Sequence, residues 1–300
     1  MNFNKERSVR MDAKKLLQQF GLQVSEAPQS IYPYSPVFKI GSVIVKRTQK
    51  KHDLTLFLED LQRRAIAIVA PIAPRQLFEE RIFTMYPFVE GRIYNESLED
   101  IQAAGRLLGK IHAASASTNV YSLDVYDVYD FTLEELAEDL ATIQQHAVES
   151  KREFVLATDI LEEAVLRQQE LAQQPLPMVA SPYDYKAQNL VYTPQPVVID
   201  PDNATFLPRI VDLALVLLLF HNEVSNQPFT EQQWREFMKG YGESITLTAS
   251  EHEHWQAVVH HLFLDEVLWL MADAAEDWGN DEQYALFVAL AKLLQHPYSL

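Results

Sequence analysis

Residues 178–203 read M-V-A-S-P-Y-D-Y-K-A-Q-N-L-V-Y-T-P-Q-P-V-V-I-D-P-D-N, and this stretch decides the fold. Residues 190–192 and 197–199 are short β-rich runs, and the T-P-Q-P between them has the composition of a turn. A turn centred on the Pro-Gln bond predicts an antiparallel hairpin in which Asn189 lies directly opposite Asp200. An amide and a carboxylate would therefore meet at the open end of this hairpin.

The loop that leads into the hairpin carries two more charged side chains. Asp184 lies five residues before Asn189, at the start of the loop, and Lys186 lies between them. Oxygen ligands of this kind suit Mg²⁺, which takes a few ligands from protein and the rest from phosphates and water. A carboxylate that stays off the metal could accept a proton from a hydroxyl nucleophile. The stretch therefore predicts a site for a hard cation and a phosphate.

The chain before this stretch combines strands with short helices. Residues 37–47, V-F-K-I-G-S-V-I-V-K-R, contain two β-rich runs that are broken by Gly-Ser, which predicts a hairpin. Apolar residues recur at helical spacing over residues 54–65, and residues 80–89 form a further β-rich run that ends at Pro and Gly. A small β-rich N-terminal part is the prediction.

From Leu98 onward long periodic segments replace the short β-rich ones. They predict helices over residues 98–114, 133–147, 154–173, 210–222, 231–241, 251–276 and 281–294. Together the patterns predict an α+β fold of two lobes, with an N-terminal lobe over residues 1–88 and a larger, mainly helical lobe over residues 89–300.

Several of these segments resemble one family. Residues 184–189, D-Y-K-A-Q-N, resemble the catalytic loop of the protein-kinase-like fold, and I-D-P-D at residues 199–202 resembles its metal-binding segment. P-R-I-V-D-L-A at residues 208–214 is similar to a helix start of the aminoglycoside phosphotransferases and their choline-kinase and homoserine-kinase relatives. Residues 104–114, ending in I-H-A-A, and the hinge-like residues 84–92 are similar to segments of the same family in the same order.

The resemblance implies a role for each matching residue. Asp184 would be the catalytic base, with Lys186 beside it, and Asn189 and Asp200 would hold Mg²⁺. Lys46 would contact the α- and β-phosphates of ATP. The residues implied for the rest of the nucleotide site are Glu59, which would pair with Lys46, and Met85, Tyr86 and Phe88, which would border the adenine.

Two further acids each have two possible roles. Asp202 could be an additional metal ligand or a turn residue. Asp212 lies in the first turn of a predicted helix, where the helix dipole favours any carboxylate, and the family implies that it also braces the catalytic loop.

The sequence departs from the family pattern at two places. Pro182 stands two residues before Asp184, where kinase-like sequences usually have a histidine that packs the loop. Residues 30–35, S-I-Y-P-Y-S, lie where a glycine-rich phosphate cover is expected and contain no glycine.

Composition excludes several classes of protein. There is no cysteine, which removes disulfides and thiolate chemistry, and no apolar run is long enough to span a membrane. A formal net charge of −17 argues against a nucleic-acid partner and favours a cationic small molecule, although the acidity could equally serve solubility. These features are consistent with a cytoplasmic protein, and they leave its oligomeric state open.

We therefore expect an ATP- and Mg²⁺-dependent phosphotransferase that acts on a hydroxyl of an aminoglycoside-, homoserine- or choline-like acceptor. The alternative is an inactive pseudokinase or ligand-binding protein with the same fold. Acids and rings that could contact a cationic acceptor lie in the C-terminal helices, and residues 124–130, D-V-Y-D-V-Y-D, could form a solvated connector or a rim of the substrate site. The candidates are Glu223, Asp265, Glu266, Asp273, Glu276, Trp255, Trp269 and Trp278.

Overall fold

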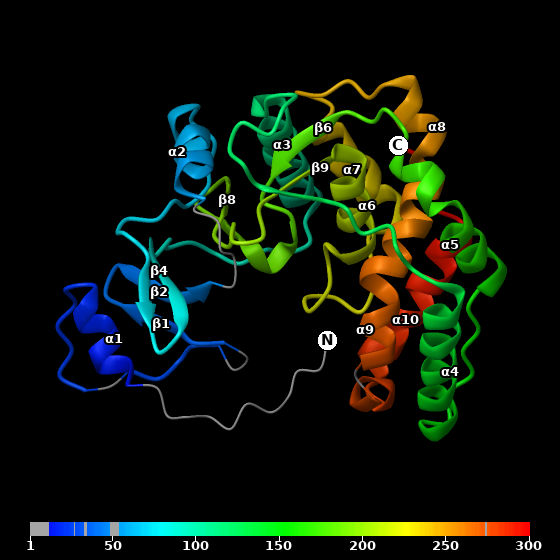
Figure 1. Ribbon diagram of the computed structural model, residues 1–300, viewed down its shortest axis with the longest axis horizontal. Helices are drawn as coiled ribbons and strands as arrows, with labels where there is room; N and C mark the ends of the chain where they lie inside the picture. The colour runs from blue at the N-terminus through cyan, green and yellow to red at the C-terminus, as the bar shows by residue number, and fades with distance from the viewer. Residues whose placement is uncertain (1–11, 27, 33–34, 49–53, 274) are drawn as a thin grey trace.

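The computed structural model describes residues 12–26, 28–32, 35–48, 54–273 and 275–300 (Figure 1). Its N-terminal part is a four-stranded antiparallel sheet in the order β1-β2-β4-β3. The strands are β1 (Val37–Ile40), β2 (Val43–Thr48), β3 (Gln76–Phe78) and β4 (Arg81–Pro87), and helix α1 (Ala13–Gln19) packs against them through Leu16 and Leu17. The predicted hairpin is confirmed, and Gly41 makes its turn with a φ of 57°.

Helix α2 (Thr55–Arg63) packs away from this sheet. Its buried face, Phe57, Leu58 and Leu61, belongs to the same hydrophobic cluster as the C-terminal helices. In Figure 1, α2 lies beside β8 and above the four-stranded sheet. The chain that follows α2 is tied to β8, because the Val69 N–H donates to the Val198 carbonyl at 2.9 Å.

The central hairpin consists of β7 (Leu190–Tyr192) and β8 (Pro196–Val198). Leu190 pairs with Val198 and Tyr192 pairs with Pro196, so the turn contains three residues. The predicted register is therefore wrong by one residue: Asn189 lies opposite Ile199, whose N–H donates to the Asn189 carbonyl at 2.9 Å, and Asp200 follows. Because this turn contains three residues, 193–195, its centre is Pro194 and not the bond between residues 194 and 195.

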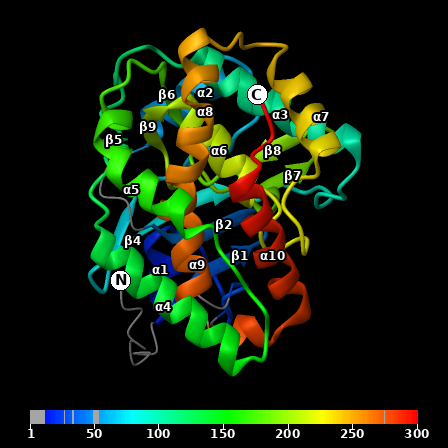
Figure 2. The ribbon, with the colours of Figure 1, turned by 90° about the vertical axis from the view of Figure 1, so that its right-hand side faces the viewer.

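The C-terminal part is mainly helical. Its longer helices are α3 (Leu98–Ala114), α4 (Leu133–Glu149), α5 (Thr158–Ala172), α6 (Arg209–Leu219), α7 (Glu231–Tyr241), α8 (Ala249–Leu262) and α10 (Asp281–Gln295). Figures 1 and 2 show α4, α5, α8, α9 and α10 on the side of the molecule away from the four-stranded sheet. Helices α3 and α7 approach closely because glycines line the contact: a Cβ on Gly105 would lie 2.0 Å from the Phe237 carbonyl oxygen.

The single helix predicted over residues 251–276 is wrong. After α8 the chain makes a π turn, η2 (Phe263–Val267), followed by the short helix α9 (Leu268–Asp273) and the 3₁₀ turn η3 (Ala275–Gly279). A π turn inserts an extra residue into the helical repeat, which changes the direction of the side chains in that turn. No helix of the described residues is long and apolar enough to cross a membrane.

A small sheet supports the loop before the hairpin. It has the order β5-β9-β6, where β5 is Asp124–Val125, β6 is Met178–Ser181 and β9 is Thr205–Pro208. Pro208 ends β9, and α6 begins at Arg209, so the proline belongs to the strand end as well as to the helix start. The antiparallel pair β6 and β9 fixes Ser181 opposite Thr205, and this pairing sets the starting point of the loop.

Candidate functional site

The loop between β6 and β7 holds Asp184 in an unusual backbone conformation. Tyr183 and Asp184 have φ angles of 51° and 49°, which non-glycine residues rarely adopt. The Asn189 side-chain amide donates to the Asp184 carbonyl at 2.9 Å and lies 3.3 Å from its carboxylate. Strained residues that are held by such contacts are common at functional sites. The loop therefore aims the Asp184 carboxylate in a fixed direction.

A buried polar cluster lies beneath this loop. Asp212 accepts a hydrogen bond from the Ser181 hydroxyl, and its Oδ2 lies 3.0 Å from Nε2 of His112. The other ring nitrogen of His112 lies 2.9 Å from the Tyr241 hydroxyl. Pro182 has no polar side chain, but Ser181 before it, together with His112 and Asp212, supplies buried polar contacts at the start of the loop. The cluster is consistent with the bracing role implied for Asp212.

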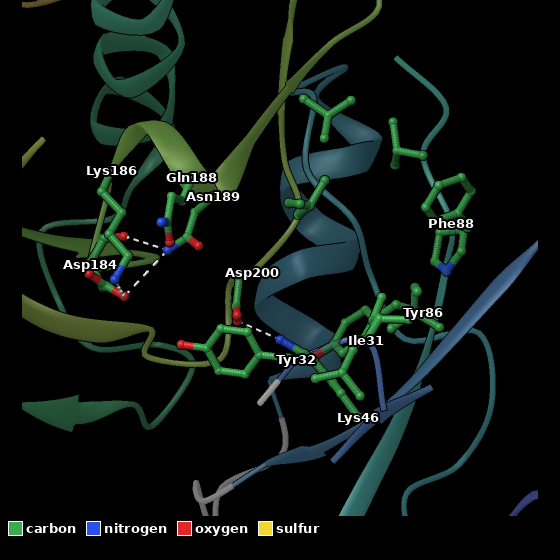
Figure 3. A pocket seen from close by; sticks show the side chains of 16 residues that line it. Ile31, Tyr32, Lys46, Tyr86, Phe88, Asp184, Lys186, Gln188, Asn189 and Asp200 are labelled. Carbon is green, nitrogen blue, oxygen red and sulfur yellow. Dashed lines mark hydrogen bonds and ion pairs between the residues drawn. The ribbon is translucent and has the colours of Figure 1, made fainter. Parts of the chain in front are cut away.

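A cavity of about 410 Å³ lies between the four-stranded sheet and the hairpin. Figure 3 shows its lining side chains, which come from β2 and β4 on one side and from the loop and hairpin on the other. Val37, Ile44 and Phe88 make apolar walls, and Asp184, Lys186, Asn189, Asp200 and Lys46 make a polar end. An apolar slot with charges at one end fits a purine base and its phosphates.

The predicted adenine-bordering residues divide into two groups. Tyr86 and Phe88 line the cavity, whereas the Met85 side chain is buried in the hydrophobic cluster of the sheet and is not among the lining residues. Of the predicted nucleotide cover, Pro33 and Tyr34 lie outside the described residues. Ile31 and Tyr32 line the cavity and are 61% and 42% exposed.

Lys46 lies at the polar end of the cavity between two carboxylates. Its Nζ is 2.5 Å from Oδ1 of Asp200 and 3.2 Å from Oδ2 of Asp202, and it also lies 5.1 Å from the centre of the Tyr86 ring. Burial lowers the pKa of Lys46, but the two carboxylates outweigh burial and raise its pKa overall. The ammonium is therefore charged at neutral pH.

Glu59 does not take the place that the resemblance implies. Its side chain is exposed on α2, and among the residues that the structure describes Asp200 and Asp202 are the carboxylates within ion-pair distance of Lys46. The physical reason is the placement of α2: its apolar face packs with the C-terminal core, so the helix does not present its acids to β2. The expected ion pair between Lys46 and Glu59 is therefore not formed in this structure, and Asp200 and Asp202 take its place.

Asn189 and Asp200 are suited to a magnesium ion that also binds phosphates. The Asn189 amide nitrogen is turned toward Asp184, which leaves its oxygen facing the opposite way. The Asp200 carboxylate is 47% exposed and lines the cavity. The described residues contain no group of three or more acidic or histidine ligands, but Mg²⁺ commonly takes only one or two protein ligands beside a nucleotide.

A second cavity, of about 630 Å³, lies on the other side of the loop. Asp184 and Lys186 line both cavities, so the two spaces meet at these residues. Among the described lining residues of the second cavity Lys186 is the only lysine or arginine. The acids that line it are Asp124, Asp127, Asp184, Glu223, Asp265 and Glu266, and the rings are Tyr126, Tyr183 and Trp269.

The π turn η2 presents two of these acids to the cavity. The Tyr126 hydroxyl donates to Asp265 at 2.8 Å, and the Tyr183 hydroxyl donates to Glu266 at 3.0 Å. Burial, and then the neighbouring Asp265, raise the pKa of Glu266 to about 7. Burial also raises the pKa of Asp184. The cavity therefore concentrates poorly solvated negative charge.

The sequence candidates for acceptor contacts are only partly brought together. Glu223, Asp265, Glu266 and Trp269 line the second cavity, whereas Trp255 and Trp278 are buried in the core, and Asp273 and Glu276 are not lining residues. Residues 124–130, interpreted from the sequence as a connector or a rim of the substrate site, contribute Asp124, Tyr126 and Asp127 to the second cavity, whereas Tyr183 was missed as a site residue. Its position directly before Asp184 was the signal that could have found Tyr183.

Together, the antiparallel sheet, the helical C-terminal part and the cavity between them define the protein-kinase-like fold. The match to known families then specifies the class: residues 44–255 match the model of the phosphotransferase enzyme family, so the chain belongs to that family and is a small-molecule kinase. No curated protein matches the chain. Its fold is similar to several solved structures at low sequence identity.

Three of these structures show the extent of the similarity. Amicoumacin kinase hAmiN is 15% identical over 99% of this chain and 98% of its own, with a TM-score of 0.61. Spectinomycin phosphotransferase APH(9)-Ia is 15% identical over 96% and 99%, with a TM-score of 0.60. Choline kinase LicA from Streptococcus pneumoniae is 16% identical over 93% and 97%, with a TM-score of 0.57. At these identities the similarity shows the fold.

Proposed function

We propose that this kinase transfers the γ-phosphoryl group of ATP to a hydroxyl of a cationic small molecule. The observation that carries the proposal is the meeting of two unlike cavities at Asp184 and Lys186. One cavity has apolar walls and a lysine for a nucleotide, and the other is lined by acids. A group that moves from one space to the other must pass these two side chains.

On the donor side the protein positions charge and does little covalent chemistry. The base of the nucleotide would lie between Ile44 and Phe88 in the apolar part of the cavity, and Lys46 would contact the phosphates. Asn189 and Asp200 would hold Mg²⁺, which neutralises phosphate charge when it is bound. The buried ammonium of Lys46 is held by carboxylates at the polar end of this cavity, where the phosphates would lie.

On the acceptor side Asp184 would receive the proton of the attacking hydroxyl. The new bond forms between the acceptor oxygen and the γ-phosphorus, the bond from that phosphorus to the bridging oxygen of ADP breaks, and the proton moves to the Asp184 carboxylate. The raised pKa of Asp184 makes it a better base than an exposed aspartate. Lys186 Nζ lies 3.4 Å from this carboxylate and would neutralise charge on the passing phosphoryl group.

The acidic lining indicates the class of acceptor. Carboxylates in a partly buried site bind ammonium groups strongly, and rings such as Tyr183 and Trp269 offer faces to the same charge. The solved structures of similar fold include kinases named for amicoumacin, spectinomycin, choline and aminopropanol. We therefore propose an alcohol that carries at least one amino or quaternary ammonium group.

The test is ATP consumption with a panel of amino-alcohols, choline-like alcohols and aminoglycosides, each with and without Mg²⁺. Turnover that depends on both Mg²⁺ and a cationic alcohol is expected, with neutral alcohols of the same size much less active. Nucleotide binding without turnover of any acceptor would instead favour an inactive, ligand-binding protein with this fold.

A further inference from the structure

Lys46 has two carboxylate partners in different surroundings. Asp200 is 47% exposed and lines the nucleotide cavity, where Figure 3 shows it pointing toward Lys46. Asp202 is only 13% exposed and is not among the described residues that line this cavity. The two acids therefore contact the same ammonium, but only Asp200 faces the space where a nucleotide and its metal would lie.

Asp202 is held rigidly in its place. Its Oδ1 accepts a hydrogen bond of 2.5 Å from the Tyr86 hydroxyl, and its Oδ2 lies 3.2 Å from Lys46 Nζ. Both of its oxygens are thus engaged by side chains of the N-terminal sheet, Tyr86 on β4 and Lys46 on β2. The space around Asp202 is a cavity of about 10 Å³, which is room for about one water and not for a hydrated metal.

The two contacts of Lys46 are not equivalent once a metal is present. A carboxylate that holds Mg²⁺ can no longer give its full charge to a lysine. Lys46 is 9% exposed, and a buried ammonium that loses its partner is strongly destabilised. The phosphates that Lys46 would contact are mobile ligand groups, so a fixed carboxylate of the protein is still needed to direct the lysine. Glu59 cannot supply it, because it is exposed on a helix that packs elsewhere.

We propose that Asp202 is the positioning residue for Lys46, the group that holds its ammonium in the nucleotide cavity while Asp200 turns to the metal. The role extends the proposed function and rests on it. Tyr86 assists by fixing the direction of the Asp202 carboxylate. Without Asp202, Lys46 would rely on Asp200 alone, and lysine and metal would compete for one carboxylate.

This competition gives a test that uses metal binding and not turnover. The affinity of Mn²⁺ for the protein is measured by electron paramagnetic resonance at a saturating concentration of a non-hydrolysable ATP analogue. The four proteins are the wild type, Asp202→Asn, Lys46→Gln and the double variant. Asp202→Asn is expected to weaken Mn²⁺ binding roughly five- to ten-fold when Lys46 is present, and less than about two-fold in the Lys46→Gln background.

Two results would overturn the proposal. If Asp202→Asn weakened Mn²⁺ binding equally in the wild-type and the Lys46→Gln backgrounds, Asp202 would be a metal ligand. If Asp202→Asn left Mn²⁺ affinity unchanged in both backgrounds, Asp202 would be a turn residue only. Failure of the proposed function would look different. A misassigned nucleotide cavity would leave the wild type without nucleotide-dependent Mn²⁺ binding, and an inactive protein would bind Mn²⁺ and nucleotide but consume no ATP with any acceptor of the panel.

Further variants keep the test decisive if Asp202→Asn does not fold. Tyr86→Phe keeps the packing and removes one hydrogen bond, and about a two- to three-fold loss of Mn²⁺ affinity is expected. Asp202→Glu restores the charge and should recover part of the lost Mn²⁺ affinity.

The matched control is Asp159→Asn, which removes an exposed carboxylate on α5 and should leave Mn²⁺ affinity unchanged. The proposal would be contradicted if Glu59→Gln lowered Mn²⁺ affinity while Tyr86→Phe left it unchanged.

Discussion

The two cavities that meet at Asp184 are built in different ways. The first cavity, which we propose for the nucleotide, takes its polar residues from one loop, one hairpin and one neighbouring strand, and most of them were recognisable in the sequence. The acidic cavity takes its lining from β5, the loop, the end of α6 and the π turn η2, which are spread over residues 124–270. Under the proposed function, the chemistry that many acceptors share is encoded locally, whereas the choice of acceptor is encoded by long-range packing.

If this division is correct, changing the shared residue Asp184 should stop the reaction without disturbing the donor side. Asp184→Asn is expected to lower kcat by about 10²- to 10⁴-fold, because the base is lost, while the affinity for nucleotide changes less than about two-fold. Steady-state rates and calorimetric titration with ATP measure the two effects. Turnover near the wild-type rate would show that Asp184 is not the base.

The acceptor side alone should respond to Glu266. Glu266→Gln removes a buried charge from the acidic cavity and is expected to raise the KM for a cationic acceptor about ten-fold or more, with the KM for ATP unchanged. Glu276→Gln is the matched control, since Glu276 is exposed and does not line the cavity. A rise in both KM values after the Glu266 change would mean that the two cavities are not independent.

The pH dependence should separate the same two sides. Glu266 has a pKa raised to about 7, above its ordinary value, so it loses its negative charge as pH falls through about 7. The facing groups are Asp265 and Asp184, which oppose its ionisation, Tyr183, whose hydroxyl donates a hydrogen bond to it, and Trp269, which favours the ionised form. The KM for a cationic acceptor is therefore expected to rise as pH falls from 8 to 6, up to about ten-fold per unit below the pKa.

Two comparisons check this pH effect. The KM for ATP should stay flat over the same range, and Glu266→Gln should remove most of the change in the acceptor KM. An acceptor KM that is independent of pH in the wild type would contradict the assigned pKa or the assigned contact.

The smallest expected effect is on the donor side. Phe88 lines the nucleotide cavity, and its ring also lies 3.6 Å below the Lys39 ammonium. Phe88→Ala should raise the KM for ATP about three- to ten-fold through lost apolar contact, with the acceptor KM unchanged. Initial rates at varied ATP and fixed acceptor measure this. An effect on the acceptor KM alone would place the nucleotide elsewhere.

Local signals predicted much of the fold. The helix starts at Leu98 and Glu231 match the predicted bounds, and N-terminal caps mark both of them. The Ser97 hydroxyl accepts a hydrogen bond from the Asp100 N–H before α3, and Thr230 and Gln233 form a capping box at the start of α7. The β1–β2 hairpin follows from Gly41, whose positive φ suits a tight turn. Each of these features depends on a few adjacent residues.

Two of the failures arose from tertiary packing and one from the length of a turn. Glu59 was placed by family order, but the direction of α2 depends on which core its apolar face joins. The π turn at residues 263–267 has no local sequence signal, although it sets the direction of Asp265 and Glu266. Asn189 came out one residue from its predicted partner because the turn contains three residues. The nearness of Asn189 and Asp200 survived this shift, since both still line the cavity.

A crystal structure of the ternary complex, with a non-hydrolysable ATP analogue and the cationic alcohol that the panel selects, tests the arrangement most directly. The nucleotide is expected in the cavity beside Lys46 and the acceptor in the acidic cavity. The acceptor hydroxyl should lie within about 3.5 Å of both the Asp184 carboxylate and the terminal phosphorus. A nucleotide in the acidic cavity, or an acceptor bound out of reach of Asp184, would contradict it.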